Sequence, residues 1–251
     1  MNQPRLLSLF CGTVSDAGWR AAGFHVTGID HKEQPRHSCD VFILADALDY
    51  VAAHGHEYDA IIASPPCQHY SQITPDKSKH PDLIPITRIA LDLTGRPYVI
   101  ENVGGARNVL RSPVMLCGMQ FGLKVYRHRF FESNVLLLGM AHWPHRDNTP
   151  SAGHGLSDNG FISITSGGNP VRYNPNAATR SGTYGISSKG FISPTGHFSG
   201  GDYCRTAMGV DRYVTNYELS QAYPPAYAEY LGRQLIRYIQ PEIREAQLNE
   251  R

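Results

Sequence analysis

The chain has 251 residues, of which 41% are hydrophobic and 18% are charged. This length and composition predict one domain with an insertion, or two small domains, and argue against long disordered stretches. The formal net charge is only +1, so a nucleic-acid partner would have to bind a local basic patch. Because the sequence has no run of 18 apolar residues and no signal-peptide pattern, we expect neither a membrane span nor an export signal.

The cysteines are scattered, and no two of them form a C-x-x-C pair. They are Cys11, Cys39, Cys67, Cys117 and Cys204. An odd, scattered set argues against a disulfide framework and against a thiolate zinc site. We therefore expect no metal, and a reducing, cytoplasmic environment for the protein.

Strand and helix signals alternate through the first part of the chain. Strand-like apolar segments lie at residues 5–10, 25–30, 58–64 and 97–103, and a further apolar segment at 39–50 is interrupted by Asp46. A short helix is expected at residues 15–24, capped by Ser15 or Asp16, and a longer one from about Ile86. The alternation predicts βαβ units and a mostly parallel sheet with helices on both faces.

Polar and reactive side chains follow the predicted strands at their carboxyl ends. They are Cys11, Asp30, Asp46, Cys67 and Glu101, with Gly12 directly after the first of them. In open α/β sheets, ligands bind at this edge of the sheet. The sequence therefore predicts that these residues share one functional site.

The second part of the chain has a different composition. Residues 141–205 are rich in glycine and turn residues, and "GFISIT" at Gly160 recurs as "GFISPT" at Gly190. The two copies mark either similar hairpin strands or a coincidence. Residues 224–239 have apolar side chains at helical spacing and predict a closing helix. We expect a catalytic domain at 1–140, a small insertion at 141–205 and a segment at 206–251 that completes the first domain.

The stretch "ASPPCQHYS" presents Cys67 directly after a predicted strand and two prolines. Prolines fix φ and stiffen the approach to the thiol. A free thiol, with a pKa of about 8.5, needs a positive or hydrogen-bonding setting to act as a nucleophile near neutral pH. A nucleophile on a rigid mount is one interpretation, and a small buried residue in a tight turn is the other.

Three further features suggest chemistry, and each has a structural alternative. Glu101 ends the apolar run "YVIENV", so burial would raise its pKa and let it donate a proton to a ring nitrogen, or it caps the next turn. Asp30 lies 18 residues after Gly12, which suits a ribose contact in a nucleoside-binding fold or a helix cap. The "RHRFF" stretch from Arg127 is an anion clamp or an ordinary basic turn.

In this order the residues resemble the cytosine-C5 DNA methyltransferases. The motifs are Phe10-x-Gly12, Asp30, Asp46, Pro66-Cys67-Gln68-x-Tyr70-Ser71, Glu101-Asn102-Val103, Arg127-x-Arg129 and Ala222-x-Pro224-Pro225. The Pro-Cys-Gln-x-aromatic-Ser and Glu-Asn-Val motifs are specific when they occur together. The resemblance covers nearly the whole chain outside about residues 141–205, and it is to a small, divergent member like those carried by bacterial viruses.

The resemblance implies a Rossmann-like class I methyltransferase fold and S-adenosylmethionine as the methyl donor. It implies that Cys67 attacks C6 of a cytosine flipped out of double-stranded DNA, that Glu101 engages N3, and that Arg127 and Arg129 hold the base or the Cys67 region. The implied cofactor contacts are Phe10, Gly12, Thr13, Asp30, Asp46, Pro66, Gln221 and Ala222. The implied DNA contacts are Gln68, Tyr70, Ser71, Lys77 and Lys79, the two lysines lying in a loop that closes on DNA in the family.

The resemblance also implies a cellular setting. It suggests a monomer in the cytoplasm of a bacterial or virus-infected bacterial cell, in the context of restriction and modification. The glycine-rich insertion would occupy the place of the target-recognition region.

The sequence departs from the family at two motifs. The family follows Phe-x-Gly with x-Gly-Gly, whereas this chain has Thr13, Val14 and Ser15 there. Glycines at such positions allow close backbone approach to a ligand. Their absence affects cofactor binding, or indicates a modified cofactor whose extra polar group meets Thr13 or Ser15. Near the C-terminus, Gln221 replaces the family's asparagine with a longer amide.

Three alternatives to DNA cytosine-C5 methylation remain open from the sequence. The first is transfer of a different alkyl group to the same carbon, and the second is methylation of cytosine in RNA. The third is a base-flipping DNA-binding protein that has lost its cofactor, against which the retention of both Cys67 and Glu101 argues.

Overall fold

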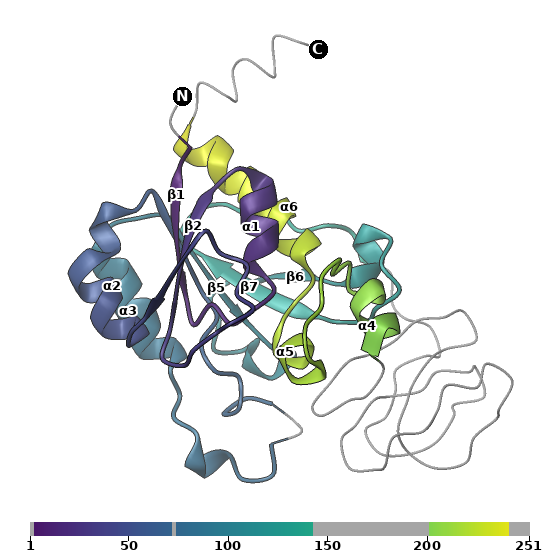
Figure 1. Cartoon of the computed structure of the whole chain (residues 1–251). Coiled ribbons are helices and arrows are strands. Elements are labelled where there is room, and N and C mark those ends of the chain that lie inside the picture. The colour runs from purple at the N-terminus through teal and green to yellow at the C-terminus, as the bar shows by residue number, and fades with distance from the viewer. Residues whose placement is uncertain (1–2, 72–73, 143–200, 241–251) are drawn as a thin grey trace, which may run out of the picture.

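The computed structural model describes residues 3–71, 74–142 and 201–240. Its centre is a seven-stranded sheet with the order β3-β2-β1-β4-β5-β7-β6 (Figure 1). The strands are β1 Arg5–Leu9, β2 His25–Asp30, β3 Val41–Leu44, β4 Ala60–Ala63, β5 Tyr98–Asn102, β6 Val114–Leu116 and β7 Arg129–Ser133. No helix in these ranges is long and apolar enough to cross a membrane.

The first five strands run parallel, and β7 is inserted antiparallel between β5 and β6. The carboxyl ends of β1, β2, β4 and β5 therefore meet at one edge of the sheet. This confirms the predicted parallel sheet. The β6–β7 pair was not predicted in the sequence, because its strands are short and lie among turn residues.

Helices cover both faces of the sheet (Figure 1). The α-helices are α1 Asp16–Ala22, α2 Ala47–His54, α3 Ile84–Thr94, α4 Gly201–Ala207, α5 Asn216–Gln221 and α6 Pro225–Ile239. Leu6 belongs to the core beneath α1 and α6, whereas its neighbour Leu7 belongs to the core beneath α2 and α3. The alternation of side chains along β1 thus supplies both layers of the core.

The helices differ from the sequence predictions in detail. Helix α3 begins at Ile84 rather than near Ile86, because Pro85 is accommodated in the first turn, where no intrahelical N–H bond is lost. The closing helix α6 is confirmed. Helix α4 begins inside the segment predicted as an insertion, and both "GFIS" copies lie outside the described residues, so the division at 140 and 205 stays a prediction.

Helix α1 and helix α6 pack in close contact, although they lie about two hundred residues apart in the chain (Figure 1). A Cβ atom placed on Gly18 of α1 would lie 1.9 Å from the carbonyl oxygen of Pro225. Because a backbone atom cannot rotate away, we expect Gly18→Ala to lower the free energy of unfolding by about 3 kcal/mol. Urea denaturation measures this change. Ala21→Ser, on the exposed side of α1, serves as the control and should change it by less than about 0.5 kcal/mol.

Asp16 is buried at the start of α1 and accepts a 2.7 Å hydrogen bond from the Ser8 hydroxyl. Burial raises its pKa to about 7 from a model-peptide value of 3.8. The folded state therefore retains a proton that the unfolded state has lost, and stability falls as pH rises between these two values.

We expect Asp16→Asn to remove this loss of stability. Three pKa units correspond to roughly 4 kcal/mol, and relaxation around the charge should reduce the gain at pH 8 to about 2 kcal/mol. Below about pH 4 the variant should gain nothing, because Asp16 is then neutral in both states. Thermal melts of both proteins from pH 4 to pH 8 measure the gain, and an advantage that does not grow with pH would contradict the interpretation.

Candidate active site

One cavity lies at the carboxyl edge of the sheet, between the ends of β1, β2, β4 and β5 and the segment that contains α5. It brings together most of the residues that the sequence singled out. These are Phe10, Cys11, Gly12, Thr13, Ser15, Asp30, Pro66, Cys67, Gln68, Glu101, Arg129, Gln221 and Ala222. The parallel arrangement explains the grouping, because neighbouring strands end at the same edge.

Cys67 stands on a loop that is tied down on both sides. The buried Asn102 amide, on β5, donates a 2.9 Å hydrogen bond to the carbonyl oxygen of Pro65. Beyond the thiol, the backbone N–H groups of Tyr70 and Ser71 both donate to the carbonyl oxygen of Cys67. The half-buried thiol is thus held at the end of β4 by its own turn and by the neighbouring strand.

Glu101 and Arg129 form a buried ion pair beside this thiol. Arg129 Nε lies 2.8 Å from Glu101 Oε1, across the antiparallel pair of β5 and β7. Burial raises the pKa of Glu101, and nearby Arg129, Arg127 and the Ser64 hydroxyl oppose that shift. The carboxyl group can therefore hold a proton more readily than an exposed glutamate, while the ion pair fixes its direction.

The charges of these arginines and of Glu101 also act on the thiol of Cys67. Burial raises the pKa of Cys67, Arg129 and Arg127 lower it, and Glu101 raises it further. At rest the group is therefore a neutral thiol at neutral pH. Its proton has to leave when the sulfur reacts, and the two arginines stabilise the thiolate that results.

Arg127 lies behind the cavity rather than in its lining. Its guanidinium is buried and donates to the backbone carbonyl of Ser220, at 2.5 Å, and its own carbonyl accepts a 2.8 Å bond from the Tyr227 hydroxyl. Burial and the nearby Arg129 lower its pKa well below the usual value. In this position Arg127 joins the carboxyl edge of the sheet to the C-terminal segment, behind the residues that line the cavity.

Asp30 borders the other half of the cavity, at the end of β2. One carboxylate oxygen accepts from the backbone N–H of Gly12 at 3.2 Å, and the other accepts from Lys32 at 3.0 Å. Gly12 has φ of +55°, and a Cβ atom there would meet nothing within 4 Å. The loop after β1 thus leaves open space beside the Asp30 carboxylate, which its two backbone hydrogen bonds hold in place.

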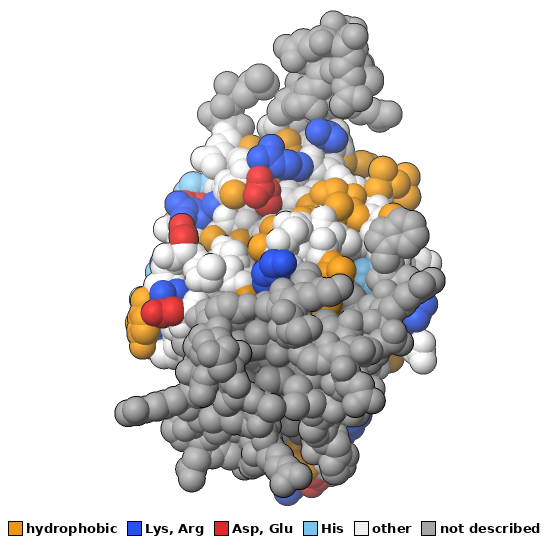
Figure 2. Space-filling view, turned by 90° about the vertical axis from the view of Figure 1, so that its right-hand side faces the viewer, with side chains coloured by type: hydrophobic (Ala, Val, Ile, Leu, Met, Phe, Trp, Pro, Cys, Tyr) orange, Lys and Arg blue, Asp and Glu red, His pale blue; other side chains and the backbone are white. Residues whose placement is uncertain are grey.

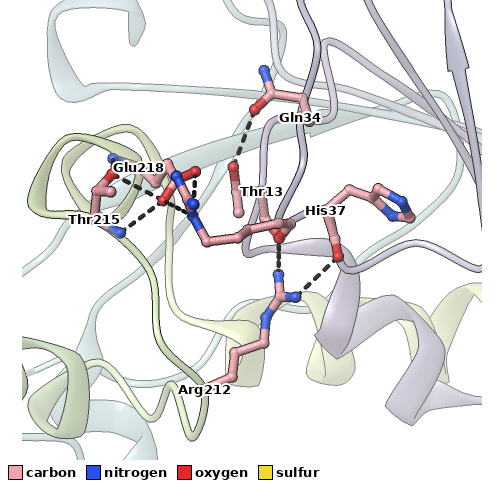
Figure 3. A network of polar contacts seen from close by, with 7 residues as sticks. Thr13, Gln34, His37, Arg212, Thr215 and Glu218 are labelled. Carbon is pink, nitrogen blue, oxygen red and sulfur yellow. Dashed lines mark hydrogen bonds and ion pairs between the residues drawn. The ribbon is translucent and has the colours of Figure 1, made fainter.

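Side chains, rather than glycines, hold this loop in place (Figure 3). The Thr13 hydroxyl donates to Gln34 at 3.1 Å, and Arg212 donates to the carbonyls of Thr13 and His37 at 2.5 and 2.9 Å. Nearby, Arg36 forms two hydrogen bonds with Glu218, at 2.9 and 3.0 Å. The network joins the N-terminal loop to the C-terminal segment and builds one wall of the cavity.

The sequence analysis did not find several members of this wall. Gln34, Tyr217 and Glu218 line the cavity, and Arg212 supports it. One signal was available for Glu218, since Thr215 and Glu218 have the spacing of a capping box, which the structure contains. No local pattern marks Gln34 or Arg212, because their partners are distant in the sequence.

Comparison with solved structures identifies the fold of the protein. No family model matches the sequence, and no curated protein matches it either. Among solved structures, the chain is similar to a protein assigned as a DNA modification methyltransferase encoded within an E. coli prophage. The TM-score is 0.54, with 15% identity over 93% of this chain and 99% of that one.

A second similar structure is the Dnmt2 methyltransferase of S. pombe. The TM-score is 0.53, with 13% identity over 95% of this chain and all of that one, 100%. Both matches extend over nearly the whole of this chain and of the similar structures, and therefore include its seven-stranded sheet. The protein has the class I methyltransferase fold.

Within this methyltransferase fold, Asp46 and Tyr70 make contacts inside the protein, and their implied contacts with cofactor and DNA stay predictions. The Asp46 side chain is the N-cap of α2, accepting from Leu48 and Asp49, and it is not part of the cavity lining. Tyr70 is buried and donates to Asp82. The structure thus gives Asp46 a capping contact and Tyr70 a core contact.

Ser71, Lys77 and Lys79 also lie outside the lining. The two lysines are exposed on the short turn η2 Lys77–Lys79, in the loop before α3, and Lys79 pairs with Asp76 at 3.2 Å. On the face seen in Figure 2, the visible described Lys and Arg side chains are scattered, several beside acidic ones. That visible part of the surface therefore presents no broad basic patch.

Gln68 lines the cavity next to the thiol, and its buried Oε1 atom has no hydrogen-bond partner among the described residues. A buried acceptor without a partner costs about 1–3 kcal/mol. Such a cost is expected where a ligand supplies the missing donor. Gln68 therefore points to this part of the cavity as a binding site.

Proposed function

We propose that the protein is a DNA cytosine-C5 methyltransferase. It would transfer a methyl group from S-adenosylmethionine to C5 of a cytosine flipped out of double-stranded DNA. The observation that carries the proposal is the constellation of Cys67, Glu101 and Arg129 in the same cavity as Asp30, on a methyltransferase fold. A thiol, a carboxyl group whose burial favours protonation and a fixed guanidinium are the groups needed to add to a pyrimidine ring.

The donor set near Asp30 fits S-adenosylmethionine. A carboxylate can accept about four hydrogen bonds, and Asp30 uses two of these positions for backbone N–H groups. The remaining positions suit the two ribose hydroxyls. Gly12 leaves space for the ligand, and Gln221 and Ala222 close the opposite side of the cavity. When bound, S-adenosylmethionine supplies an activated methyl group on a sulfonium.

The side chains of Thr13 and Ser15, in the loop where the family has glycines, favour S-adenosylmethionine itself rather than a modified cofactor. The Ser15 hydroxyl already donates to the Tyr223 carbonyl and accepts from the Tyr223 N–H, at 3.2 and 3.3 Å. The Thr13 hydroxyl donates to Gln34. Neither side chain needs an extra polar group on the cofactor, because both have partners within the protein.

Cys67 would form a bond from its sulfur to C6 of the cytosine, after its S–H proton is lost. C5 is a poor nucleophile until C6 carries this substituent. Glu101, whose pKa is raised by burial, would donate a proton to N3 and neutralise the charge that develops on the ring. After C5 has been methylated, its proton passes to water, the C6–sulfur bond breaks to return the thiolate, and N3 returns its proton to Glu101.

Arg129 would act on both Glu101 and Cys67. Its contact with Glu101 orients the carboxyl group, and its charge stabilises the thiolate of Cys67. Gln68 would donate or accept at the flipped base or at the adjacent backbone. On the DNA side, the exposed Lys77 and Lys79 would contact phosphates, as a weak local basic patch on an otherwise nearly neutral protein.

Mass spectrometry of nucleosides from the DNA of expressing cells tests the proposal. We expect 5-methylcytosine, and deamination-based sequencing of the same DNA gives its sequence context. A heavier cytosine adduct would instead indicate transfer of a different alkyl group. In vitro, duplex DNA and tRNA are compared as acceptors of labelled methyl groups, and labelling of tRNA alone would contradict DNA as the substrate.

A further inference from the structure

A second cluster of reactive side chains lies beside the β6–β7 pair, away from the residues assigned to methyl transfer. Cys117 follows β6 directly, His128 precedes β7 directly, and His142 lies at the end of its described segment. One ligand atom from each lies within 4.8 Å of the other two. The cysteine is fully buried and both histidines are half-buried, so the group is shielded from bulk water.

The spacing of the two histidines is already that of metal ligands. Their Nε2 atoms are 3.2 Å apart. In a tetrahedral zinc site, with Zn–N bonds of about 2.0–2.1 Å, two nitrogens lie about 3.3 Å apart, and a nitrogen and a sulfur about 3.6 Å. The sulfur of Cys117 would therefore have to move by only about 1 Å at most to complete such a site.

The backbone around the cluster holds two of the ligands in place. The Cys117 N–H donates to Gln120 Oε1 at 2.7 Å, and Gln120 Nε2 donates to the carbonyl of Met140 at 2.9 Å. A single side chain thus ties the segment of the cysteine to the segment of His142. Such supporting hydrogen bonds are what orients ligands in metal sites.

The backbone near the sulfur suits a metal-bound thiolate. The N–H groups of Met119, Arg127 and Gly118 lie near the Cys117 sulfur, where they can donate to it.

We propose that Cys117, His128 and His142 bind one zinc ion, with water in the fourth position. A thiolate with two imidazoles favours Zn²⁺ over the hard cations Mg²⁺ and Ca²⁺. On binding, the thiol releases its proton to solvent. Both Nε2 atoms offer lone pairs in place of the hydrogen they now share, and their protons reside on Nδ1.

The ion would have a positioning role. His128 lies between Arg127 and Arg129, so a metal bond to it fixes the backbone from which Arg129 reaches Glu101. The same ion would fasten β6 and the chain at His142 to that point. Zinc would thus brace the antiparallel edge of the sheet without contacting the reacting base.

Metal analysis of untagged protein, purified without chelators, tests the proposal. We expect about one zinc ion per chain, reduced at least about tenfold in Cys117→Ala and in His142→Ala. Cys204→Ala and His56→Ala are the matched controls, a buried thiol and an exposed histidine outside the cluster, and should retain the zinc. Circular dichroism shows whether each variant is folded.

Cobalt substitution gives an independent readout that needs no enzymatic activity. Co²⁺ in the site should show the visible bands of a tetrahedral ion and a thiolate charge-transfer band, which Cys117→Ala removes. Chelation should lower the melting temperature of the wild-type protein and leave that of Cys117→Ala unchanged. Metal-free wild-type protein that takes up neither ion, or a cobalt spectrum unaffected by Cys117→Ala, would overturn the proposal whatever the outcome for methyl transfer.

Discussion

Cys67→Ser should lower the rate of methyl transfer to DNA by at least about 10⁴-fold, which corresponds to about 5.5 kcal/mol of transition-state stabilisation. The serine hydroxyl occupies the same position but is a far weaker nucleophile, so C6 receives no substituent and C5 is never activated. DNA binding should persist, because the substitution removes no charge. Transfer of labelled methyl groups and an electrophoretic binding assay measure the two properties.

A covalent trap separates this role from a structural one. DNA in which 5-fluorocytosine replaces cytosine should form an adduct with the wild-type protein that survives denaturation, since C5 then has no proton to lose. Cys67→Ser should form none. Cys204→Ala, which removes a buried thiol outside the cavity, should form the adduct normally. Near-normal methyl transfer by Cys67→Ser would refute the assignment of the nucleophile.

Glu101→Gln should lower kcat by roughly 10² to 10³-fold. The amide keeps the shape of the carboxyl group and can still donate a hydrogen bond, but it cannot transfer a proton to N3. It also leaves Arg129 without its buried counter-charge, so we expect some loss of stability as well. Single-turnover assays at a temperature well below the melting transition separate the two effects.

Glu132→Gln is the matched control for that experiment. Glu132 is also a buried glutamate paired with an arginine, since Arg88 donates two hydrogen bonds to it at 2.6 and 2.7 Å. It does not line the cavity. Its substitution should lower the melting temperature and leave kcat within about threefold. Equal losses of kcat in the two variants would mean that Glu101 acts through stability alone.

The sheet and the grouping of residues at its carboxyl edge could be predicted because they depend on local patterns. Buried parallel strands are short apolar runs, so β2 was predicted with the bounds that the structure has, and β1, β4 and β5 within two residues. Once the strands are parallel, the residues that follow them have to meet at one edge. Cys67 and Glu101 were therefore predictable as neighbours, although their roles stay proposals until they are tested.

The limits of the sequence appear at residues whose partners are distant. Asp46 lies just after β3 and Asp30 ends β2, yet Asp46 caps α2, because that helix begins one residue later and offers its free N–H groups. Tyr70 belongs to the motif of Cys67 but turns into the core. The scattered cysteines argued against a thiolate zinc site, whereas the fold brings Cys117 beside two histidines from other segments.

The sequence by itself determined the order of the strands along the chain, their burial and the reactive groups at their ends, since these follow from local periodicity. Only the tertiary structure decided which of those groups face one cavity and what holds its walls. Arg212 and Thr13 are 199 residues apart and meet through a hydrogen bond. Such contacts depend on how helices and loops pack over the sheet, and no local pattern encodes them.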